Sequence, residues 1–171
     1  MADIKKTFGQ IYDRYVEKIY RFIFFKVNSQ EIAEDLASET FLKTWEVFKN
    51  GKEIENMQAF LYKTARNLVI DYYREKGKVQ IVSADNPSIT DPNQNLEEKA
   101  MLKSDLNTVR QALANLKEDY QNVIIWHYLD DLPIQEISYM LGRTEEATRV
   151  LLSRALKSLR EKIENSQSNI S

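Results

Sequence analysis

The spacing of apolar residues in the first half of the chain predicts three amphipathic helices. Apolar side chains recur there at intervals of three and four residues, which gathers them on one side of a helix. The helices are expected from about Phe8 to Ile23, from Gln30 to Lys49 and from Met57 to Lys76. Each has one face that needs a partner, so the three should pack as an N-terminal helical bundle.

Four further helices are predicted in the second half. An amphipathic stretch runs from Leu102 to Leu116, and Tyr120 to Tyr128 is apolar on nearly all sides, which is typical of a buried helix. A short helix begins at Pro133, a residue favoured at the first helical position, and the last helix extends to about Glu164. No strand pattern recurs, so the expected fold class is all-α. Glycine, which readily adopts the left-handed conformation of a helix end, follows three predicted helices, at Gly51, Gly77 and Gly142.

A polar segment separates the two halves. Residues 79–95 contain Pro87 and Pro92, no aromatic residue, and many Ser, Asn, Asp and Thr residues, a composition typical of a linker. We therefore expect two small helical domains, residues 1–78 and residues 96–171. A linker of about 17 residues spans at most roughly 60 Å when extended.

Composition argues against several classes of chemistry. The 171 residues are 43% hydrophobic and 29% charged, as in soluble globular proteins. The chain has no cysteine, which excludes disulfides, a thiol nucleophile and a cysteine zinc site and suits a reducing cytoplasm. The single histidine, His127, argues against a histidine metal site or a serine triad, and its position after Trp126 in the buried helix indicates a packing role. We expect no metal, no cofactor and no enzymatic activity.

Membrane insertion and secretion are not expected from this sequence. The longest apolar runs, Phe22–Phe25 and Val123–Trp126, are far too short to cross a bilayer. The N-terminal residues Met1–Lys6 lack the apolar core of a signal peptide. The expected location of the protein is therefore the cytoplasm.

The net charge of the chain is −2, but two of the predicted helices are basic. Five basic residues stand against two acidic ones from Asn56 to Lys78, and five stand against one from Arg149 to Lys162. Basic residues clustered on single helices are the electrostatic signature of nucleic-acid binding. An ordinary solvated helix face has the same composition, and charge alone favours that simpler interpretation.

The second predicted helix has the opposite character. Glu31, Asp35 and Glu39 follow one another at intervals of four residues, with Glu46 further along, and this acidic stripe lies away from the apolar face. The stripe is either a solvated face, in which Glu39 pairs with Lys43, or a docking surface for a basic partner.

Residues 131–148 have the pattern of a helix-turn-helix. A short helix is followed by Gly142, and Thr144 offers an N-cap oxygen to the next helix. Glu145 and Glu146 then occupy the first turn, where the helix dipole favours acidic side chains. A plain pair of helices looks similar, but the basic character of the second helix favours DNA binding.

Three stretches resemble one known family. Residues 33–46, AEDLASETFLKTWE, resemble region 2.2 of bacterial RNA polymerase sigma factors, and residues 59–74, AFLYKTARNLVIDYYR, resemble their regions 2.3 and 2.4. Residues 113–159 resemble region 4. Nothing resembles region 1 or region 3, so the likeness, which covers about residues 8–164, is to the short extracytoplasmic-function group.

The resemblance implies partners and contact residues. Such factors bind core RNA polymerase, through its β′ clamp and β subunit, and promoter DNA, and an anti-sigma factor is a common further partner. The implied contacts with a basic coiled coil of the β′ clamp are Asp35, Glu39, Leu42 and Glu46. The implied contacts with the melted −10 strand, beside the loop Lys49–Asn56, are Tyr62, Lys63, Arg66, Asn67, Ile70 and Arg74. The implied −35 contacts are Thr144, Thr148, Arg149, Val150, Ser153, Arg154 and Lys157.

Two further expectations concern side-chain orientation. The −10 contacts should lie roughly opposite the apolar residues Phe60, Leu61 and Leu68 of the same helix. Trp45 has the spacing of a core residue, although it lies in the region 2.2 stretch.

The recognition helix departs from the family's usual pattern at two positions. That pattern is Thr-Val-Lys/Arg-Ser-Arg-Leu, and residues 147–152 read Ala-Thr-Arg-Val-Leu-Leu. Arg149 keeps the cation, whereas Val150 and Leu151 replace a hydroxyl and a second cation. Val150 instead offers an apolar contact to a thymine methyl group.

Two other functions fit parts of the same sequence. A self-sufficient helix-turn-helix repressor would form a dimer and bind its operator tightly without polymerase. A structural helical adaptor would leave both basic helices as solvated faces. The sigma-factor interpretation instead places two weak DNA contacts about two helical turns, roughly 70 Å, apart on one promoter.

Overall fold

The structure is a computed structural model that describes residues 2–79 and 97–168, with side chains described for residues 3–77 and 106–166. The chain divides into two compact units, Met1–Ala84 and Asp85–Ser171. Within the described residues every regular element is a helix and no strand occurs, so the predicted all-α fold with two small domains is confirmed. The predicted linker lies almost entirely outside the described residues.

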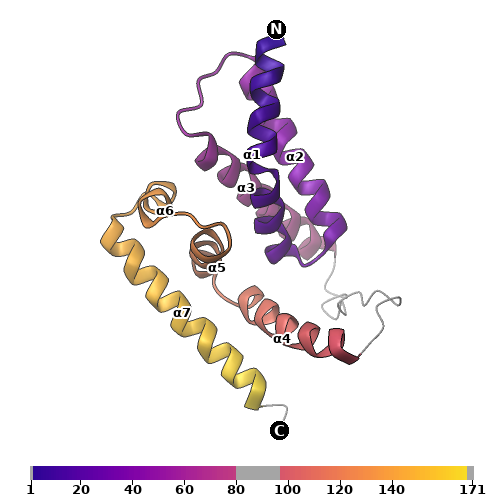
Figure 1. Cartoon of the computed structure of the whole chain (residues 1–171), viewed down its shortest axis with the longest axis vertical. Helices are drawn as coiled ribbons and strands as arrows, with labels where there is room; N and C mark the ends of the chain where they lie inside the picture. The colour runs from indigo at the N-terminus through magenta and orange to yellow at the C-terminus, as the bar shows by residue number, and fades with distance from the viewer. Residues whose placement is uncertain (1, 80–96, 169–171) are drawn as a thin grey trace. The chain divides into compact units, whose positions relative to one another are not determined.

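The first unit is a three-helix bundle of α1 (Ala2–Val27), α2 (Gln30–Lys49) and α3 (Met57–Val79). Each of these helices packs against the other two, and Figure 1 shows α1 and α2 alongside one another. The side chains buried between them are mainly apolar: Ile19, Phe22, Ile23, Ala33, Ala37, Phe41, Leu61, Ala65, Leu68 and Val69.

Two polar contacts help to position the helices of the first unit: one caps the start of α2, and the other joins α3 to α1. The side chain of Ser29 accepts a hydrogen bond from the Ile32 amide and so caps the first turn of α2. Near the end of α1, the Tyr73 hydroxyl donates to the Lys26 carbonyl, which ties α3 to α1. Burial raises the pKa of Tyr73 above its usual value, and the charge on neighbouring Tyr72 raises it further by a smaller amount.

Two of the three predicted glycine helix ends are confirmed. Gly51 follows α2 with φ +78°, and Gly142 ends α6 (Ile134–Leu141) with φ +65°. Both angles lie in the left-handed region that glycine adopts without strain. The prediction for Gly77 is wrong, because α3 continues through that residue to Val79.

The second unit has its own core. It contains α4 (Glu97–Ala114), α5 (Glu118–Ile124), η1 (Ile125–Leu129), α6 and α7 (Glu145–Ser168). The long helix α7 packs against α4, α5 and α6, and it is the yellow helix in Figure 1. The apolar side chains buried in this unit include Leu113, Leu116, Val123, Ile125, Leu132, Ile137, Leu151, Leu152 and Ala155.

The predicted helix at residues 120–128 is in fact α5 followed by a π-helical turn, η1. The Asp130 amide bonds to the Ile125 carbonyl at 2.9 Å, five residues back rather than four. After this turn the Nδ1 atom of His127 lies 3.0 Å from the Leu132 carbonyl oxygen. Since that oxygen can only accept, Nδ1 carries the proton in this contact. Pro133 precedes α6 as its N-cap instead of being its first residue.

Candidate polymerase and nucleic-acid interfaces

The acidic stripe of α2 is exposed along its length. Asp35, Glu39 and Glu46 are exposed, and Leu42 among them has 58% of its surface accessible. The opposite side of the helix faces the core through Thr40 and Thr44 as well as apolar residues, and each threonine hydroxyl donates to a carbonyl one turn earlier. These internal bonds satisfy the buried hydroxyls, so the two threonines can face the core. The exposed acidic residues and the buried residues therefore lie on opposite sides of α2.

An apolar groove borders the acidic stripe between α1 and α2. It has a volume of about 430 Å³. The rings of Tyr12 and Phe41 meet edge to face in it with centroids 5.0 Å apart, and Tyr12 is exposed. Its lining also includes the carboxylates of Glu17 and Glu34. Helical periodicity did not indicate this groove, because its two walls come from different helices.

Trp45 belongs to an aromatic cluster formed by residues of α1 and α2. Its ring centroid lies 5.1 Å from that of Phe8 and 6.5 Å from that of Phe48. All three residues are half-buried. Trp45 therefore packs at the edge of the bundle and is half-buried, whereas its spacing predicted a core position.

The outer side of α3 carries most of the predicted −10 contacts. Lys63, Asn67 and Arg74 are exposed, and Arg66 and Ile70 are half-buried. Arg74 also lies 3.8 Å from Asp71 in an exposed pair within the helix. Such a pair contributes little to stability and leaves the cation accessible.

The placement of Tyr62 on that outer side is wrong. Tyr62 retains 1% of its accessible surface, and its ring packs edge to face on Phe22 with centroids 5.3 Å apart. The core side of α3 is wide enough to include it, because Tyr62, Ala65 and Val69 follow one another at intervals of three and four residues. That spacing was visible in the sequence and identifies Tyr62 as a core residue.

The loop before α3 ends in a cap. The side-chain oxygen of Asn56 accepts from the Ala59 amide at 3.0 Å, which fixes the start of the helix. Most of the loop residues between α2 and Asn56 are exposed. The loop is thus anchored at its end and accessible over most of its length.

The helix-turn-helix predicted in the second unit is present as α6, a short turn and α7. Gly142 closes α6, and the Arg143 amide bonds to the Ser138 carbonyl at 3.1 Å. The Thr144 hydroxyl oxygen then accepts from the Ala147 amide at 3.0 Å, as predicted for an N-cap. These contacts hold the turn tightly and set where α7 begins.

Five of the predicted −35 residues are exposed on α7, and Thr144 is exposed in the turn before it. The five on the helix are Arg149, Val150, Ser153, Arg154 and Lys157.

The prediction for Thr148 is wrong, because this side chain is completely buried. Its hydroxyl lies 2.9 Å from that of Ser138 and donates to the Thr144 carbonyl. Leu151 is also buried, so its position faces the core and not solvent.

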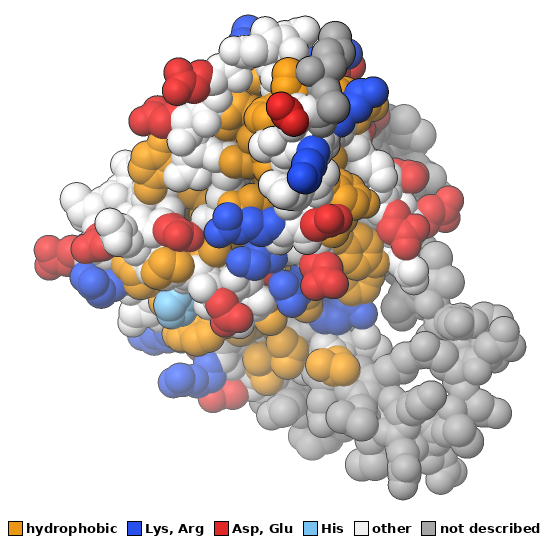
Figure 2. Space-filling model, turned by 45° about the horizontal axis from the view of Figure 1, so that its top comes forward, with side chains coloured by type: hydrophobic (Ala, Val, Ile, Leu, Met, Phe, Trp, Pro, Cys, Tyr) orange, Lys and Arg blue, Asp and Glu red, His pale blue; other side chains and the backbone are white. Residues whose placement is uncertain are grey.

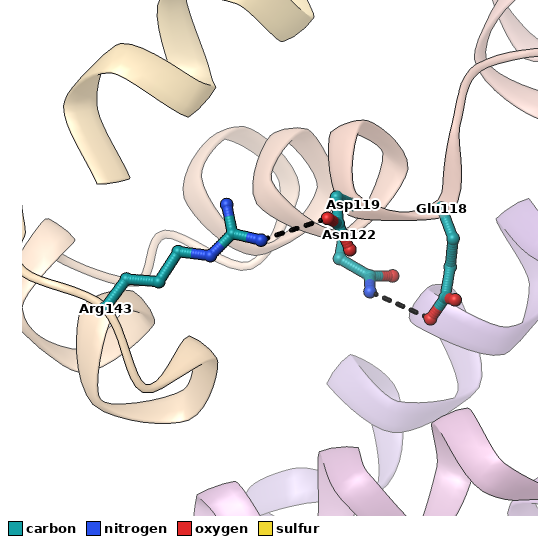
Figure 3. A network of polar contacts seen from close by, with 4 residues as sticks. All are labelled: Glu118, Asp119, Asn122 and Arg143. Carbon is teal, nitrogen blue, oxygen red and sulfur yellow. Dashed lines mark hydrogen bonds and ion pairs between the residues drawn. The ribbon is translucent and has the colours of Figure 1, made fainter. Parts of the chain in front are cut away.

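An ion pair that the sequence did not indicate joins the turn to α5. In Figure 3 the Arg143 side chain reaches from the turn before α7 to Asp119 in the first turn of α5. Their nitrogen and oxygen atoms lie 3.2 Å apart, and both side chains are partly exposed. Nearby, Asn122 donates to Glu118 at 3.3 Å. Arg143 and Asp119 lie 24 residues apart in sequence, so helical periodicity could not pair them.

Neither sign of charge dominates the surface drawn in Figure 2. Lysine and arginine side chains are interspersed there with acidic and apolar ones. This distribution matches a net charge of −2. Long-range attraction to DNA is therefore weak, and contacts with DNA depend on individual side chains.

Residues 3–77 and 106–166 hold no group of three or more His, Cys, Asp or Glu side chains that could bind a metal ion. None of the helices described here is long and apolar enough to cross a membrane.

Two solved structures share the fold of this chain. CnrH, solved with the cytosolic domain of CnrY, is 17% identical with a TM-score of 0.68, over 94% of this chain and 90% of that one. RpoE from Bartonella quintana, solved with the anti-sigma factor NepR, is 21% identical with a TM-score of 0.67, over 93% and 98%. At these identities the likeness establishes the fold alone.

Sequence comparison matches both units. Residues 11–79 match Sigma-70 region 2, and residues 106–159 match Sigma-70, region 4. BldN of Streptomyces coelicolor, an ECF RNA polymerase sigma factor, is 26% identical over 90% of this chain, which spans only 59% of BldN. SigM of Bacillus subtilis, another ECF RNA polymerase sigma factor, is 26% identical over 90% of this chain and 93% of its own length. The chain is a member of the extracytoplasmic-function group of the sigma-70 family.

Proposed function

We propose that this protein binds core RNA polymerase and directs it to promoters by recognising the −35 element and melting the −10 element. The observation that carries the proposal is that acidic and basic side chains lie on different exposed helix faces. An exposed acidic stripe lies on α2, and exposed arginines follow a capped helix-turn-helix on α7. In this proposal the polymerase performs the chemistry of RNA synthesis, and this chain positions it on the promoter.

The acidic stripe and the groove beside it form the proposed polymerase-docking surface. Asp35, Glu39 and Glu46 present carboxylates to a basic coiled coil of the β′ clamp, and exposed Leu42 adds an apolar contact. The groove between α1 and α2 accepts a neighbouring apolar side chain of that partner, with Glu17 and Glu34 in its lining. Apolar contact and opposite charge together favour one docking orientation.

The outer side of α3 is proposed to hold the melted non-template strand. Lys63, Arg66 and Arg74 supply cations for the phosphate backbone, and Asn67 can hydrogen-bond a base edge. Ile70 gives an apolar surface for an unstacked base. Tyr62 takes no part because it is buried in the bundle.

The exposed side of α7 is proposed to enter the major groove at the −35 element. Arg149, Arg154 and Lys157 are available for phosphates, and Ser153 and Val150 for bases. The ion pair between Arg143 and Asp119 links the turn that precedes this helix to α5.

Regulation by an anti-sigma factor is also proposed. The structure of RpoE was solved with the anti-sigma factor NepR, and this chain has the same fold. A partner of that kind would cover the docking and DNA-binding surfaces named above. We place the protein in the cytoplasm, where core polymerase and promoter DNA are found.

Promoter binding by the free protein and by the reconstituted holoenzyme tests the proposal. The free protein should bind promoter duplex with a dissociation constant no tighter than about micromolar at physiological salt. Core polymerase should make binding tight and sequence-specific, because it fixes both units on one promoter at high effective concentration. Nanomolar, sequence-specific binding by the free protein would contradict the proposal and favour the self-sufficient repressor.

A further inference from the structure

We propose that Glu146 and Val150 read a cytosine and a thymine that lie within two base pairs of each other in the −35 element. The inference rests on the proposed function, in which α7 enters the major groove. It adds the identities of two bases and a recognition role for Glu146.

The packing of α7 determines which of its residues point away from the second unit. Thr148 is completely buried and contacts Ser138, so it marks the inner side of the helix. An α-helix turns by about 100° per residue, so residues two positions before and after Thr148 both lie about 160° from it around the helix axis. Those residues are Glu146 and Val150, and both are exposed. They lie on the outer side, one helical turn apart.

The chemistry of these two side chains selects particular bases. A carboxylate only accepts hydrogen bonds, and cytosine offers the N4 amino donor in the major groove. Guanine and thymine present acceptors there, and the N7 acceptor of adenine lies beside its amino group, so these bases disfavour a carboxylate. Val150 has no polar atom and matches the C5 methyl group of thymine.

The spacing of the two side chains limits how far apart the two bases can lie. Four residues of α-helix rise about 6 Å. Successive bases along one DNA strand are about 3.4 Å apart. Side chains one helical turn apart therefore contact bases that are one or two steps apart.

Two arginines make a carboxylate tolerable so close to DNA. Arg149 and Arg154 are exposed, and they lie about 100° and 120° from Thr148 on opposite flanks of α7. In that position they can contact the phosphates on either side of the groove while Glu146 faces the bases. Glu146 is left to discriminate between bases, and the arginines supply the attraction.

Glu145 provides a matched control. It is exposed, carries the same charge and shares the first turn of α7, where both acids favour the helix dipole. It lies three residues before Thr148, only about 60° from the inner side. A change at Glu145 therefore alters the charge and the helix start without touching the outer side.

The test is transcription by the reconstituted holoenzyme from a promoter library with randomised −35 positions, read by sequencing the transcripts. The wild-type protein should select cytosine at one position and thymine within two base pairs. Glu146→Gln should reduce the cytosine preference about 5- to 150-fold and favour adenine there, because a glutamine amide can bond both N6 and N7 of adenine. Glu145→Gln should keep the wild-type profile.

A second measurement tests Val150 separately. Replacing the selected thymine by deoxyuridine removes only the methyl group. This replacement should lower wild-type transcription and have a smaller effect on Val150→Ala, because alanine lacks the two γ-methyl groups of valine and makes a smaller apolar contact. Equal sensitivity of the two proteins would overturn the assignment of Val150.

Other outcomes separate this inference from the proposed function. An unchanged profile for Glu146→Gln, or equal changes for both glutamine variants, would overturn the reading of cytosine while promoter-directed transcription stands. The absence of any −35-dependent transcript from the wild-type holoenzyme would contradict the proposed function and this inference with it. Circular dichroism of each variant verifies that α7 is intact.

Discussion

The hydroxyl of Ser138 in α6 lies 2.9 Å from the hydroxyl of Thr148 in α7, where both side chains are buried. Ser138 also lies 2.8 Å from the Ile134 carbonyl, and Thr148 donates to the Thr144 carbonyl at 2.8 Å. Thr148 uses its only hydroxyl hydrogen inside α7, so its oxygen is available to accept from the Ser138 hydroxyl, and this hydrogen bond links the two helices. This link sets the rotation of α7 relative to α6.

Ser138→Ala should loosen the helix-turn-helix. The change removes a buried hydrogen bond between α6 and α7, which should lower local stability by about 1 kcal/mol. Hydrogen exchange of the α6 and α7 amides in the full chain measures the loss. Ser153→Ala, at an exposed position of α7, should change exchange by no more than about 0.5 kcal/mol. Equal effects of the two variants would show that the contact does not link the helices.

Reversing charge on the acidic stripe should weaken binding to core polymerase. Asp35→Lys and Glu39→Lys each turn an attraction toward a basic partner into a repulsion, and both residues are exposed, so the fold should persist. Titration of labelled protein with core polymerase measures the affinity. Asp3→Lys makes the same charge change at an exposed position near the N-terminus and should leave the affinity unchanged. Unchanged affinity in the stripe variants would contradict the docking assignment.

Arg66→Ala and Asn67→Ala should impair opening of the promoter without affecting binding to core polymerase. The first removes a phosphate contact and the second a contact to a base edge. Permanganate footprinting of the open complex reports the melted region. The same footprint in both variants as in the wild type would exclude this side of α3 from the −10 contact.

Arg154→Ala should reduce the use of −35-dependent promoters by the holoenzyme. Loss of one phosphate contact should also lower the slope of log affinity against log salt by about one unit. A titration of promoter with holoenzyme at several salt concentrations measures both effects. Glu161→Ala, further along α7, should leave the slope unchanged, and a slope unaffected by Arg154→Ala would argue against a phosphate contact.

Tyr73→Phe should destabilise the first unit at neutral pH by about 1 kcal/mol, because it removes the hydrogen bond to the Lys26 carbonyl. Burial raises the pKa of Tyr73 in the folded state. The hydroxyl therefore stabilises the fold fully below about pH 10 and loses this effect as the pH rises through the raised value.

Urea unfolding of both proteins at about pH 8 and pH 11 tests this, and their difference should shrink at the higher pH. Tyr128→Phe, at an exposed position of the other unit, should show no comparable difference at either pH. A gap between wild type and Tyr73→Phe that stays constant with pH would rule out the phenol as its source.

Features set by neighbouring residues could be predicted from the sequence. The bounds of α2 match the expected Gln30–Lys49, because a serine cap and a left-handed glycine mark its ends. The cap at Thr144 and the helix end at Gly142 were predicted for the same reason. Local chemistry decides these features, and the sequence displays it directly.

Features that need two elements could not be predicted in the same way. Thr148 was assigned to DNA by its position in a motif, whereas its neighbour in the fold, Ser138, places it in the core. Gly77 did not end its helix, since glycine only permits the left-handed conformation and does not require it. The groove between α1 and α2 likewise depends on packing that no single helix encodes.

The wide turn η1 has a consequence for how this chain can change in evolution. It accommodates one residue more than an α-helical turn, and the chain beyond it leads to buried Leu132 and Ile137. Losing a residue from the turn would rotate the following side chains by about 100° and turn those two away from the core. Substitutions at its exposed Tyr128 are tolerable, but insertions and deletions within Ile125–Leu129 are not. We expect the length of this segment to be preserved among relatives more strictly than its sequence.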